Sequence, residues 1–326
     1  TEIRAGNVGE PTAMLYPLGW GIQGPITGNL ITDRVNVNLC HLTNAPPPPS
    51  EIFEDVTNLW KIETENEFTV AWSEDDNTVY KFWEQNTRIV DGRYEIPIPF
   101  KHDVVNFPNN RVYAQGRLRS TLKGLRLKGK FDSYKAEIDL MLKEGYAEKV
   151  PVDQLNRNDG MVFYLPHFPV YHPDKPLKTR PVHDAAAQFQ GISLNNQCYS
   201  GPNLTNPLAS ILTRFREFLE AIGSDVTAMY LQVLIPMAQR DVLRFLWIDD
   251  DGNLIELRMT RHIFGGIWCA ASTTYAIRRA AQEAAASLAV ELAIRRDMYV
   301  DDLLHSVPPP EHAARFALAV RNAVLP

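Results

Sequence analysis

Two adjacent aspartates, Asp301 and Asp302, constrain the fold of this chain more than any other feature of its sequence. They lie between two short β-prone runs, residues 298–300 and 303–305, which predict two strands meeting at the aspartates in a tight turn. Like charges side by side in apolar surroundings repel each other and are costly to desolvate, so something should offset that cost. A pair of divalent cations would do so, since Mg²⁺ prefers carboxylate oxygens, water and substrate phosphate. Taken alone, such a pair is more often a surface turn.

A third carboxylate is then expected elsewhere, and Asp225 is the best candidate. It follows the lead-in 221–224 and precedes the strand-like run 226–233.

Charge is unevenly distributed along the chain. The formal net charge of −6 argues, taken alone, against a polynucleotide ligand, because phosphate contacts come from Lys and Arg. However, residues 111–130 carry seven bases and no acid, whereas residues 51–76 carry nine acids and one base. A bound polynucleotide would interact with the local electrostatic potential of such a segment, which the net charge of the chain does not describe. A solvated basic helix face is the alternative interpretation of residues 111–130.

The four prolines at 46–49 are the clearest linker signal. They predict three segments: residues 1–45, with short strands and turns but no independent domain; residues 46–103, a connector; and residues 104–326, the main domain. The sequence contains no long apolar segment and no secretory leader, so we expect a soluble intracellular chain without a membrane partner. The three cysteines are too widely spaced for a zinc cluster or a disulfide framework.

Several elements can be predicted from local patterns. A helix is expected over Phe131–Lys143 with a stop at Gly145, and an Ala-rich stretch without Gly or Pro predicts one long helix over 270–296. Residues 242–247 and 254–259 read as a hairpin around a turn at 250–253. Further strand-like runs cover 162–165, 168–171, 179–183 and 221–233.

The motifs Tyr299-Val300-Asp301-Asp302 and Ser224-Asp225-Val226-Thr227-Ala228-Met229-Tyr230 resemble the Tyr-x-Asp-Asp box and the first carboxylate motif of reverse transcriptases. The order and spacing of upstream motifs resemble the polymerase of BEL/Pao retrotransposons; these motifs are residues 164–167, 178–186, 191–195, 201–202 and 214–216. Residues 91–94 and 116–118 are similar to the connector before that polymerase. Residues 18–20 with Gly24 resemble the tail of its aspartic protease.

The resemblance implies an RNA-directed DNA polymerase that adds dNTPs to a primer 3′-hydroxyl by two-metal phosphoryl transfer. Asp225 and Asp301 would bridge two Mg²⁺ ions, with Mn²⁺ able to substitute, and Asp302 would be the supporting third carboxylate. The backbone carbonyl of Val226 would be a further metal ligand.

The same resemblance assigns nucleotide-binding residues. Lys178 and Arg180 would meet the triphosphate, where the planar fork of an arginine suits phosphate oxygens. Tyr230 would lie under the sugar and exclude a 2′-hydroxyl. Without the motif match the default interpretation is a core tyrosine on a palm strand, and the two interpretations do not exclude each other. Phe264 and Gly265 would pack against the template and the nascent base pair.

Two departures from the family pattern qualify these assignments. Cys269-Ala270 stands where a Ser-Pro pair is usual, which puts the geometry of the template grip in doubt. The sequence contains no Asp-Thr-Gly or Asp-Ser-Gly, so the protease-like residues cannot support proteolysis. Histidines without ligand spacing are expected to be core or surface residues; they are His167, His183, His262 and His305.

The fold that the resemblance implies is α+β: fingers over residues 104–206, and a palm built on a four-stranded antiparallel sheet of the split βαβ, ferredoxin-like type backed by helices. In this palm Asp225 would end one strand, and Asp301-Asp302 would occupy a facing hairpin. The sequence ends soon after the aspartate pair, so we expect the thumb, ribonuclease H and integrase regions of the Pol polyprotein to be partners in the same element. Other expected partners are an RNA template, a DNA primer, their hybrid and dNTPs, in a cytoplasmic virus-like particle or in the nucleus.

Two other interpretations remain. An inactive or host-retained retroelement fragment could bind nucleic acid without polymerising. An unrelated metal-dependent nuclease or cyclase on a similar palm would explain the three aspartates but not the motifs at 178–195. Primer extension discriminates between the first of these and a polymerase.

Overall fold

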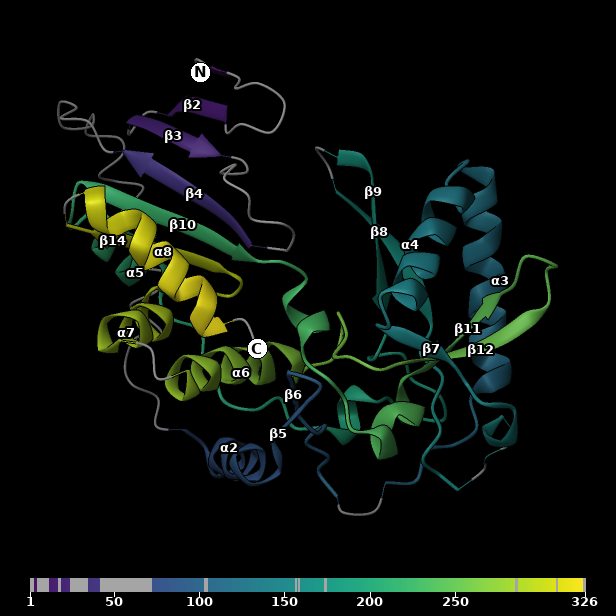
Figure 1. Ribbon diagram of the computed structural model, residues 1–326. Helices are drawn as coiled ribbons and strands as arrows, with labels where there is room; N and C mark the ends of the chain where they lie inside the picture. Colours follow the sequence, from purple (N-terminus) through teal and green to yellow (C-terminus); the bar gives the residue numbers. More distant parts are fainter. Residues whose placement is uncertain are drawn as a thin grey trace. The chain divides into compact units, whose positions relative to one another are not determined.

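The computed structural model describes the backbone of residues 3–4, 12–16, 19–23, 35–41, 72–102, 105–155, 157, 159–172, 175–284, 287–308 and 310–324 (Figure 1). These residues fall into two compact units. The first unit takes residues 203–229 and 274–326 together with the segment up to residue 71, and the second unit takes residues 72–202 and 230–273. The predicted linker at 46–49 lies outside the described residues. The boundaries predicted at 45 and 103 stay predictions.

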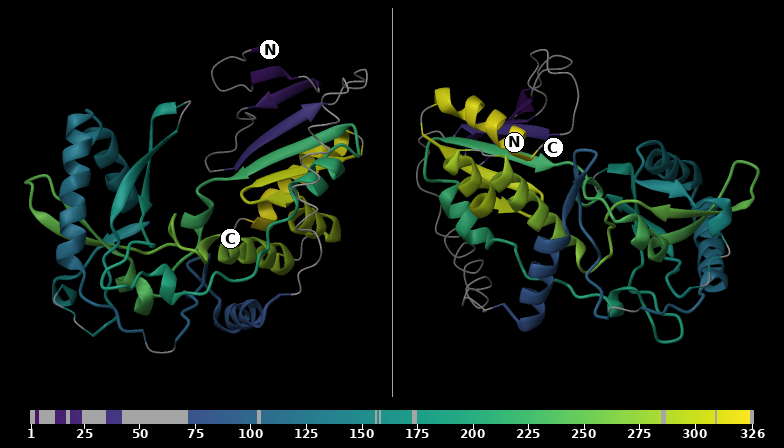
Figure 2. Two further views of the ribbon diagram at one scale, coloured as in Figure 1. Left: turned by 180° about the vertical axis from the view of Figure 1, so that it is seen from behind. Right: turned by 60° about the horizontal axis from the view of Figure 1, so that its bottom comes forward.

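An antiparallel sheet of seven strands forms the first unit (Figure 2). Its order is β1 (Ile3–Arg4), β2 (Thr12–Tyr16), β3 (Gly19–Gln23), β4 (Val35–His41), β10 (Glu220–Val226), β14 (Asp302–Val307) and β13 (Met298–Tyr299). The prediction of a four-stranded sheet was wrong in size, because β4 pairs with β10 along its whole length and brings β1 to β3 with it. The short strands predicted within residues 1–45 are confirmed.

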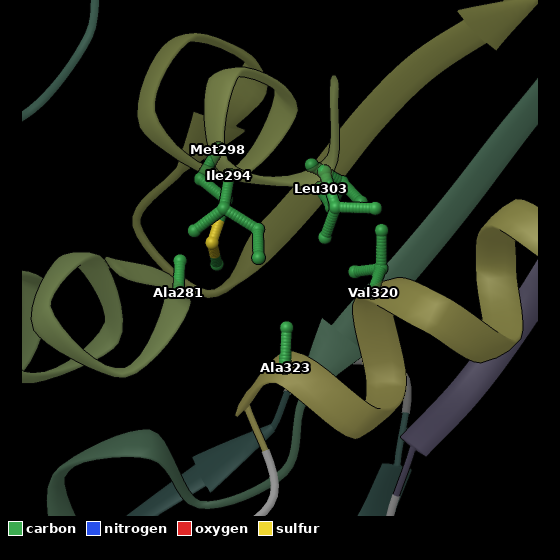
Figure 3. Packing of buried hydrophobic residues seen from close by; sticks show 7 residues of the cluster. Ala281, Ile294, Met298, Leu303, Val320 and Ala323 are labelled. Carbon is green, nitrogen blue, oxygen red and sulfur yellow. The ribbon is translucent and has the colours of Figure 1, made fainter. Parts of the chain in front are cut away.

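Helices α5 (Leu208–Arg214), α7 (Leu288–Asp297) and α8 (Pro310–Val324) pack against this sheet, and α6 (Cys269–Glu283) enters the unit at Thr274. Figure 3 shows how Ala281, Ile294, Met298, Leu303 and Val320 converge from the helices and from the β13–β14 hairpin. Each is at least nine-tenths buried. This cluster anchors the hairpin to the helices, so the turn that joins its strands has a fixed base.

The single long helix predicted over 270–296 is two helices. The α7 helix starts at Leu288, and the side chain of Ser287 accepts a hydrogen bond from the backbone N–H of Val290. A serine hydroxyl that satisfies an N-terminal N–H favours a new helix start at that point. The alanine content of the segment favoured helix throughout but gave no sign of the break.

The second unit contains several short strands and two long helices. A three-stranded sheet has the order β11 (Arg244–Ile248), β12 (Leu254–Met259), β7 (Ala147–Lys149), and two hairpins pair β5 (Arg88–Val90) with β6 (Arg93–Glu95) and β8 (His167–His172) with β9 (Lys175–His183). Its helices are α2 (Glu74–Asn86), α3 (Arg111–Leu127) and α4 (Phe131–Lys143), with 3-10 turns at Val152–Gln154, Asn195–Gln197 and Met237–Leu243. A further 3-10 turn, Met229–Gln232, crosses between the units in sequence.

The sequence predictions for this unit were mostly confirmed. The α4 helix has the predicted bounds, and Gly145 follows it with a positive φ of 68°, as a helix stop requires. The β11–β12 hairpin also forms as predicted. Residues 162–165 were wrongly predicted as a strand: only Tyr164 makes a bridge, to Arg244. The strand predicted over 221–233 ends at Val226, and Ala228 there takes a φ of 51°.

A network of ion pairs is buried in the second unit. The guanidinium of Arg244 lies 2.8 Å from Asp241 and 3.1 Å from Glu256, and Arg258 lies 3.1 Å from the same Asp241 oxygen. Arg157 binds the other oxygen of Asp241. Arg244 and Asp241 are at most 1% exposed, so the contacts between opposite charges must offset the cost of removing these groups from water.

In the described part of the chain no helix is long and apolar enough to cross a bilayer.

Candidate functional site

The register of two strands brings Asp225 and Asp302 together. Asp225 lies one residue before the end of β10, Asp302 begins β14, and the two residues are direct cross-strand partners. Partners of this kind share one face of the sheet, with Cβ atoms about 5 Å apart. Residues 77 positions apart in sequence thus meet at one end of the sheet, as the sequence analysis expected of a strand end and a facing hairpin.

Asp301 is held at the same end by a backbone hydrogen bond. Tyr299 pairs with Asp302 in the β13–β14 hairpin, which leaves Val300 and Asp301 as the turn. The carbonyl oxygen of Asp301 accepts a hydrogen bond of 2.8 Å from the N–H of Val226, the last residue of β10. The turn therefore lies across the end of the strand that carries Asp225.

The turn is conformationally strained at Val300. This residue has a φ of 56°, in the left-handed region that a β-branched side chain rarely adopts. A left-handed conformation costs an L-residue about 1–2 kcal/mol. Strain of this sort persists where the surrounding structure fixes the backbone, and it is frequent at functional sites.

Electrostatics separates this group of carboxylates from an ordinary surface cluster. Burial raises the pKa of Asp302 above its usual value, and the negative charges of Asp301 and Asp225 raise it further. Both neighbouring charges that raise this pKa are negative, so the fold holds three like charges close enough to affect one another. The repulsion would be relieved by a bound cation.

The donor set suits a hard divalent cation, because three carboxylates offer the oxygen ligands that Mg²⁺ prefers. Nevertheless, among the residues that the structure describes, no three acidic, histidine or cysteine side chains converge closely enough to hold one ion. The backbone register places Asp225 and Asp302 side by side, and the hydrogen bond from Val226 to the Asp301 carbonyl holds the third aspartate at the same end of the sheet. The residues therefore fit the group by chemistry and by backbone position. The carbonyl of Val226 as a ligand stays a prediction.

Three side chains to which the sequence analysis assigned no role in the site fix the base of the hairpin. Asp297, the last residue of α7, accepts hydrogen bonds from Arg214 at 2.6 Å and from Nδ1 of His305 at 2.7 Å. Burial alone would raise the pKa of Asp297, but the hydrogen bonds from His305 and Arg214 outweigh burial and hold this pKa below its usual range. The ring of His305 also stacks on Phe316 of α8, with centroids 4.7 Å apart.

Arg214 and Asn206 also bind backbone carbonyls where α7 ends and β13 begins. The amide of Asn206 donates to the carbonyl of Arg295 at 3.0 Å and to that of Met298 at 2.9 Å, and Arg214 donates to the carbonyl of Arg296. Arg214 belongs to the motif at 214–216, whereas Asp297 and His305 have no spacing in the sequence that predicts a role in the site. We interpret these residues as positioning groups for the turn that carries Asp301.

The predicted nucleotide-binding residues lie in the second unit. Arg180 is exposed on β9, and the side chain of Lys178 lies outside the described residues. The rings of Tyr230 and Phe264 are in contact, with centroids 4.8 Å apart and planes tilted by 56°. The two groups of predicted residues therefore belong to different units.

Gly265 permits a close approach between two backbone segments of the second unit, while its packing against a template stays a prediction. It has a φ of 121°, and a Cβ at this residue would lie 2.1 Å from the carbonyl oxygen of His183. The amide of Asn195 donates to the Gly265 carbonyl at 3.0 Å and accepts from the N–H of Ile267 at 3.1 Å. Parts of three sequence motifs, at 178–186, 191–195 and 264–265, therefore meet within one unit.

Cys269, at the position that departs from the family pattern, is a buried structural residue. Its side chain is 1% exposed, burial raises the pKa of its thiol to about 12, and its N–H donates to the carbonyl of Gly266 at 3.1 Å. A thiol of this kind is not reactive at neutral pH. Cys198 is also buried, so both cysteines pack in the core as small hydrophobic residues.

Comparisons with known proteins gave matches only among solved structures. No family model and no curated protein matches the chain. The chain is similar to a crystal structure of the prototype foamy virus protease-reverse transcriptase CSH mutant, with 16% identity, a TM-score of 0.46, and coverage of 87% of this chain and 32% of the other.

Two foamy viral protease-reverse transcriptase structures with double-stranded DNA also match. One has 17% identity, a TM-score of 0.47, and coverage of 87% of this chain and 51% of the other. The second, a dRH form, has 14% identity, a TM-score of 0.45, and coverage of 89% of this chain and 50% of the other. The chain thus spans a third to a half of the length of these proteins. Because TM-scores below 0.5 describe loose superpositions, we infer function from the site's own residues.

Proposed function

We propose that the chain is the fingers-and-palm part of a retroelement reverse transcriptase, with Asp225, Asp301 and Asp302 as its metal-binding carboxylates. The observation that carries the proposal is the direct pairing of Asp225 with Asp302, while the Asp301 carbonyl is bound to the N–H of Val226. Two motifs selected for their resemblance to polymerase carboxylate motifs therefore meet at one end of one sheet. An unrelated pair of surface turns would have no reason to do so.

In this proposal the chain's own residues position the reaction, and Mg²⁺ supplies the charge neutralisation. When bound, the two cations would lower the pKa of the primer 3′-hydroxyl and neutralise charge on the incoming triphosphate. Asp225 and Asp301 would hold both cations, and Asp302 would support them from the paired strand. Asp297, with Arg214 and His305, would keep the hairpin in register, and its contacts need no cation.

Several finer assignments belong to the same proposal. Arg180 and Lys178 would contact the triphosphate, Tyr230 would select against a 2′-hydroxyl, and Phe264 with Gly265 would support the template base. The packing of the Tyr230 ring on Phe264 supports a fixed orientation for that tyrosine. The BEL/Pao lineage, the RNA template and DNA primer, and a virus-like particle as location rest on the motif resemblance alone.

Primer extension tests the proposal directly. A poly(A)–oligo(dT) duplex with dTTP and Mg²⁺ or Mn²⁺ at low salt should be extended by the chain, and Asp301→Asn should abolish extension. Asp251→Asn, an exposed acid in the turn after β11, is the matched control and should extend like the wild type. Extension by the Asp301→Asn variant at the wild-type rate would refute the assignment of the carboxylates.

A second candidate function, binding of nucleic acid without synthesis, is favoured by the α3 helix. Arg119, Lys123 and Lys128 are exposed, and no ion pair is found for them among the described residues. Arg119 and Lys123 are four residues apart, so they share one face of the helix. The second function would replace the first if the chain does not extend the primer but shifts the duplex in a gel, and if Arg119→Gln and Lys123→Gln weaken that shift.

A further inference from the structure

An arginine with unsatisfied donors lies in the second unit. Arg261 follows β12, and its Nε and Nη1 atoms are buried without a hydrogen-bond partner among the described residues. A guanidinium is always charged and has five N–H donors in a rigid plane. Buried charged donors without an acceptor cost more than neutral ones, so native structures rarely leave them so. A bound acceptor would therefore stabilise these two N–H groups.

The backbone brings a second arginine close to Arg261. Residues 233–235 lie between two other segments: Leu234 exchanges hydrogen bonds of 2.8 and 3.0 Å with residues 94–96, and on the other side it forms a β-bridge with Arg261. Arg93 immediately precedes Tyr94 in β6. Its Nη1 donates to the side-chain oxygen of Gln232 at 2.6 Å, which keeps the guanidinium beside this three-stranded arrangement.

A third guanidinium comes from the 3-10 turn that follows the same segment. Nε of Arg240 donates to the carbonyl of Ile235 at 3.0 Å. Its Nη1 lies 3.5 Å from Glu148, but that carboxylate already binds Nε of Arg258 at 2.7 Å. Glu148 is therefore shared between two arginines and cannot balance the remaining positive charge.

Electrostatics agrees with this shortage of negative charge. Burial lowers the pKa of Arg261 to about 10, and the positive charges of Arg93 and Arg240 contribute to the lowering. Tyr146 and Asp91 act in the opposite direction without cancelling it. Asp91 is an exposed residue in the β5–β6 turn, so its effect is screened by solvent.

We propose that Arg93, Arg240 and Arg261 form a binding site for a doubly charged phosphate group, either free phosphate or the terminal phosphate of a nucleic acid strand. The planar fork of a guanidinium matches two phosphate oxygens, and arginine is the residue most used for such bidentate contacts. A dianion offsets more of the charge on three half-buried guanidiniums than a single phosphodiester does. The site involves none of the residues assigned to polymerisation above.

Phosphate binding to the full chain tests this inference. Isothermal titration with inorganic phosphate, against chloride at equal ionic strength, should detect binding in the wild type. Arg261→Gln and Arg93→Gln should each weaken binding about tenfold or more, because each removes a charged hydrogen-bond donor. Lys143→Gln, at an exposed position in the last turn of α4, is the control and should bind like the wild type. Arg93 lies on a partly exposed hairpin, so its variant keeps the test valid if Arg261→Gln fails to fold.

A second arm distinguishes the sources of the phosphate. A single-stranded oligonucleotide with a 5′-phosphate should compete with inorganic phosphate if the terminal group enters the site, and the same oligonucleotide with a 5′-hydroxyl should not. Competition by neither oligonucleotide would assign the site to free phosphate. Equal competition by both would indicate contacts to phosphodiesters and overturn the preference for a dianion. No phosphate binding, or equal binding by the wild type and both arginine variants, would mean that internal water satisfies Arg261 and would overturn the proposal.

Discussion

Two charge clusters, one in each unit, are built on opposite principles. In the second unit, Asp241 is buried and contacts the guanidiniums of Arg157, Arg244 and Arg258. In the first unit, Asp225, Asp301 and Asp302 lie at one end of a sheet, and the charges that shift the pKa of Asp302 are both negative. One cluster is balanced within the fold; the other gathers charge of one sign.

The difference teaches how a structural cluster of charges can be told from a functional one. Buried ions of opposite sign compensate each other and make the cluster part of the fold's own stability balance. Like charges that strand pairing holds close together repel each other and do not stabilise the folded state. Their arrangement therefore suggests a ligand of opposite charge. The ion pairs of Asp241 therefore need no ligand, whereas the three aspartates would be stabilised by the cation that we propose they bind.

Replacing one acid in each cluster should give opposite effects on stability. Asp241→Asn leaves three guanidiniums without their shared carboxylate and should lower the free energy of unfolding by about 3–5 kcal/mol. Asp302→Asn removes a repelled charge and should leave the free energy of unfolding unchanged or slightly raised. Urea unfolding at pH 7 without divalent cations measures both. Equal losses in the two variants would erase the distinction between the clusters.

Acid should also act with opposite sign on the two regions. Burial lowers the pKa of His167 and His262 from 6.5 to about 4 and that of His183 to about 3, so these histidines are neutral in the folded second unit. The unfolded chain binds protons at these residues from about pH 6.5 downward, so stability falls with pH until the folded pKa values are reached. Each histidine should cost about 2 kcal/mol between pH 6.5 and pH 5. Asp302, whose folded pKa is raised, favours the folded state as pH falls.

His183→Phe sharpens this prediction. The ring of His183 packs edge-on against Phe245 with centroids 4.9 Å apart, and its Nε2 is buried without a hydrogen-bond partner among the described residues. Phenylalanine fills the same space and cannot titrate, so the fall in stability between pH 6.5 and pH 5 should be smaller by about 2 kcal/mol. An unchanged pH profile from urea midpoints would show that His183 is not the group that acid protonates.

The smallest expected effect concerns the turn that joins β13 to β14. Val300→Gly removes the Cβ that makes a φ of 56° costly, and the relief exceeds the added flexibility of glycine, so the free energy of unfolding should rise by up to about 1 kcal/mol. Val300→Ala keeps a Cβ and should bring no such gain. Thermal unfolding of the two variants measures the difference. A lower stability for the glycine variant would mean that the turn is not strained.

Local patterns predicted the elements that depend on local sequence. The bounds of α4, the β11–β12 hairpin and the hairpin at Asp301-Asp302 follow from helix stops, turn residues and strand-prone runs. The meeting of Asp225 with Asp302 was also expected, because motif order suggested it.

Other features depend on contacts between distant segments and could not be predicted. The pairing of β4 with β10 enlarged the sheet, and nothing in residues 35–41 indicates a partner near residue 220. The Arg214–Asp297–His305 contacts join residues 83 and 8 positions apart, and single charged residues carry no spacing signal. The break before Leu288 depends on one serine cap within a helix-favouring stretch.

Binding of Mn²⁺ to the full chain, followed by electron paramagnetic resonance at pH 7, tests most directly whether the three like-charged carboxylates exist to hold a cation. The wild type and the control Asp251→Asn should bind Mn²⁺ at a site that is lost in both Asp225→Asn and Asp301→Asn. If these two variants bind Mn²⁺ as the wild type does, the carboxylates do not form a metal site and the proposed function fails with them.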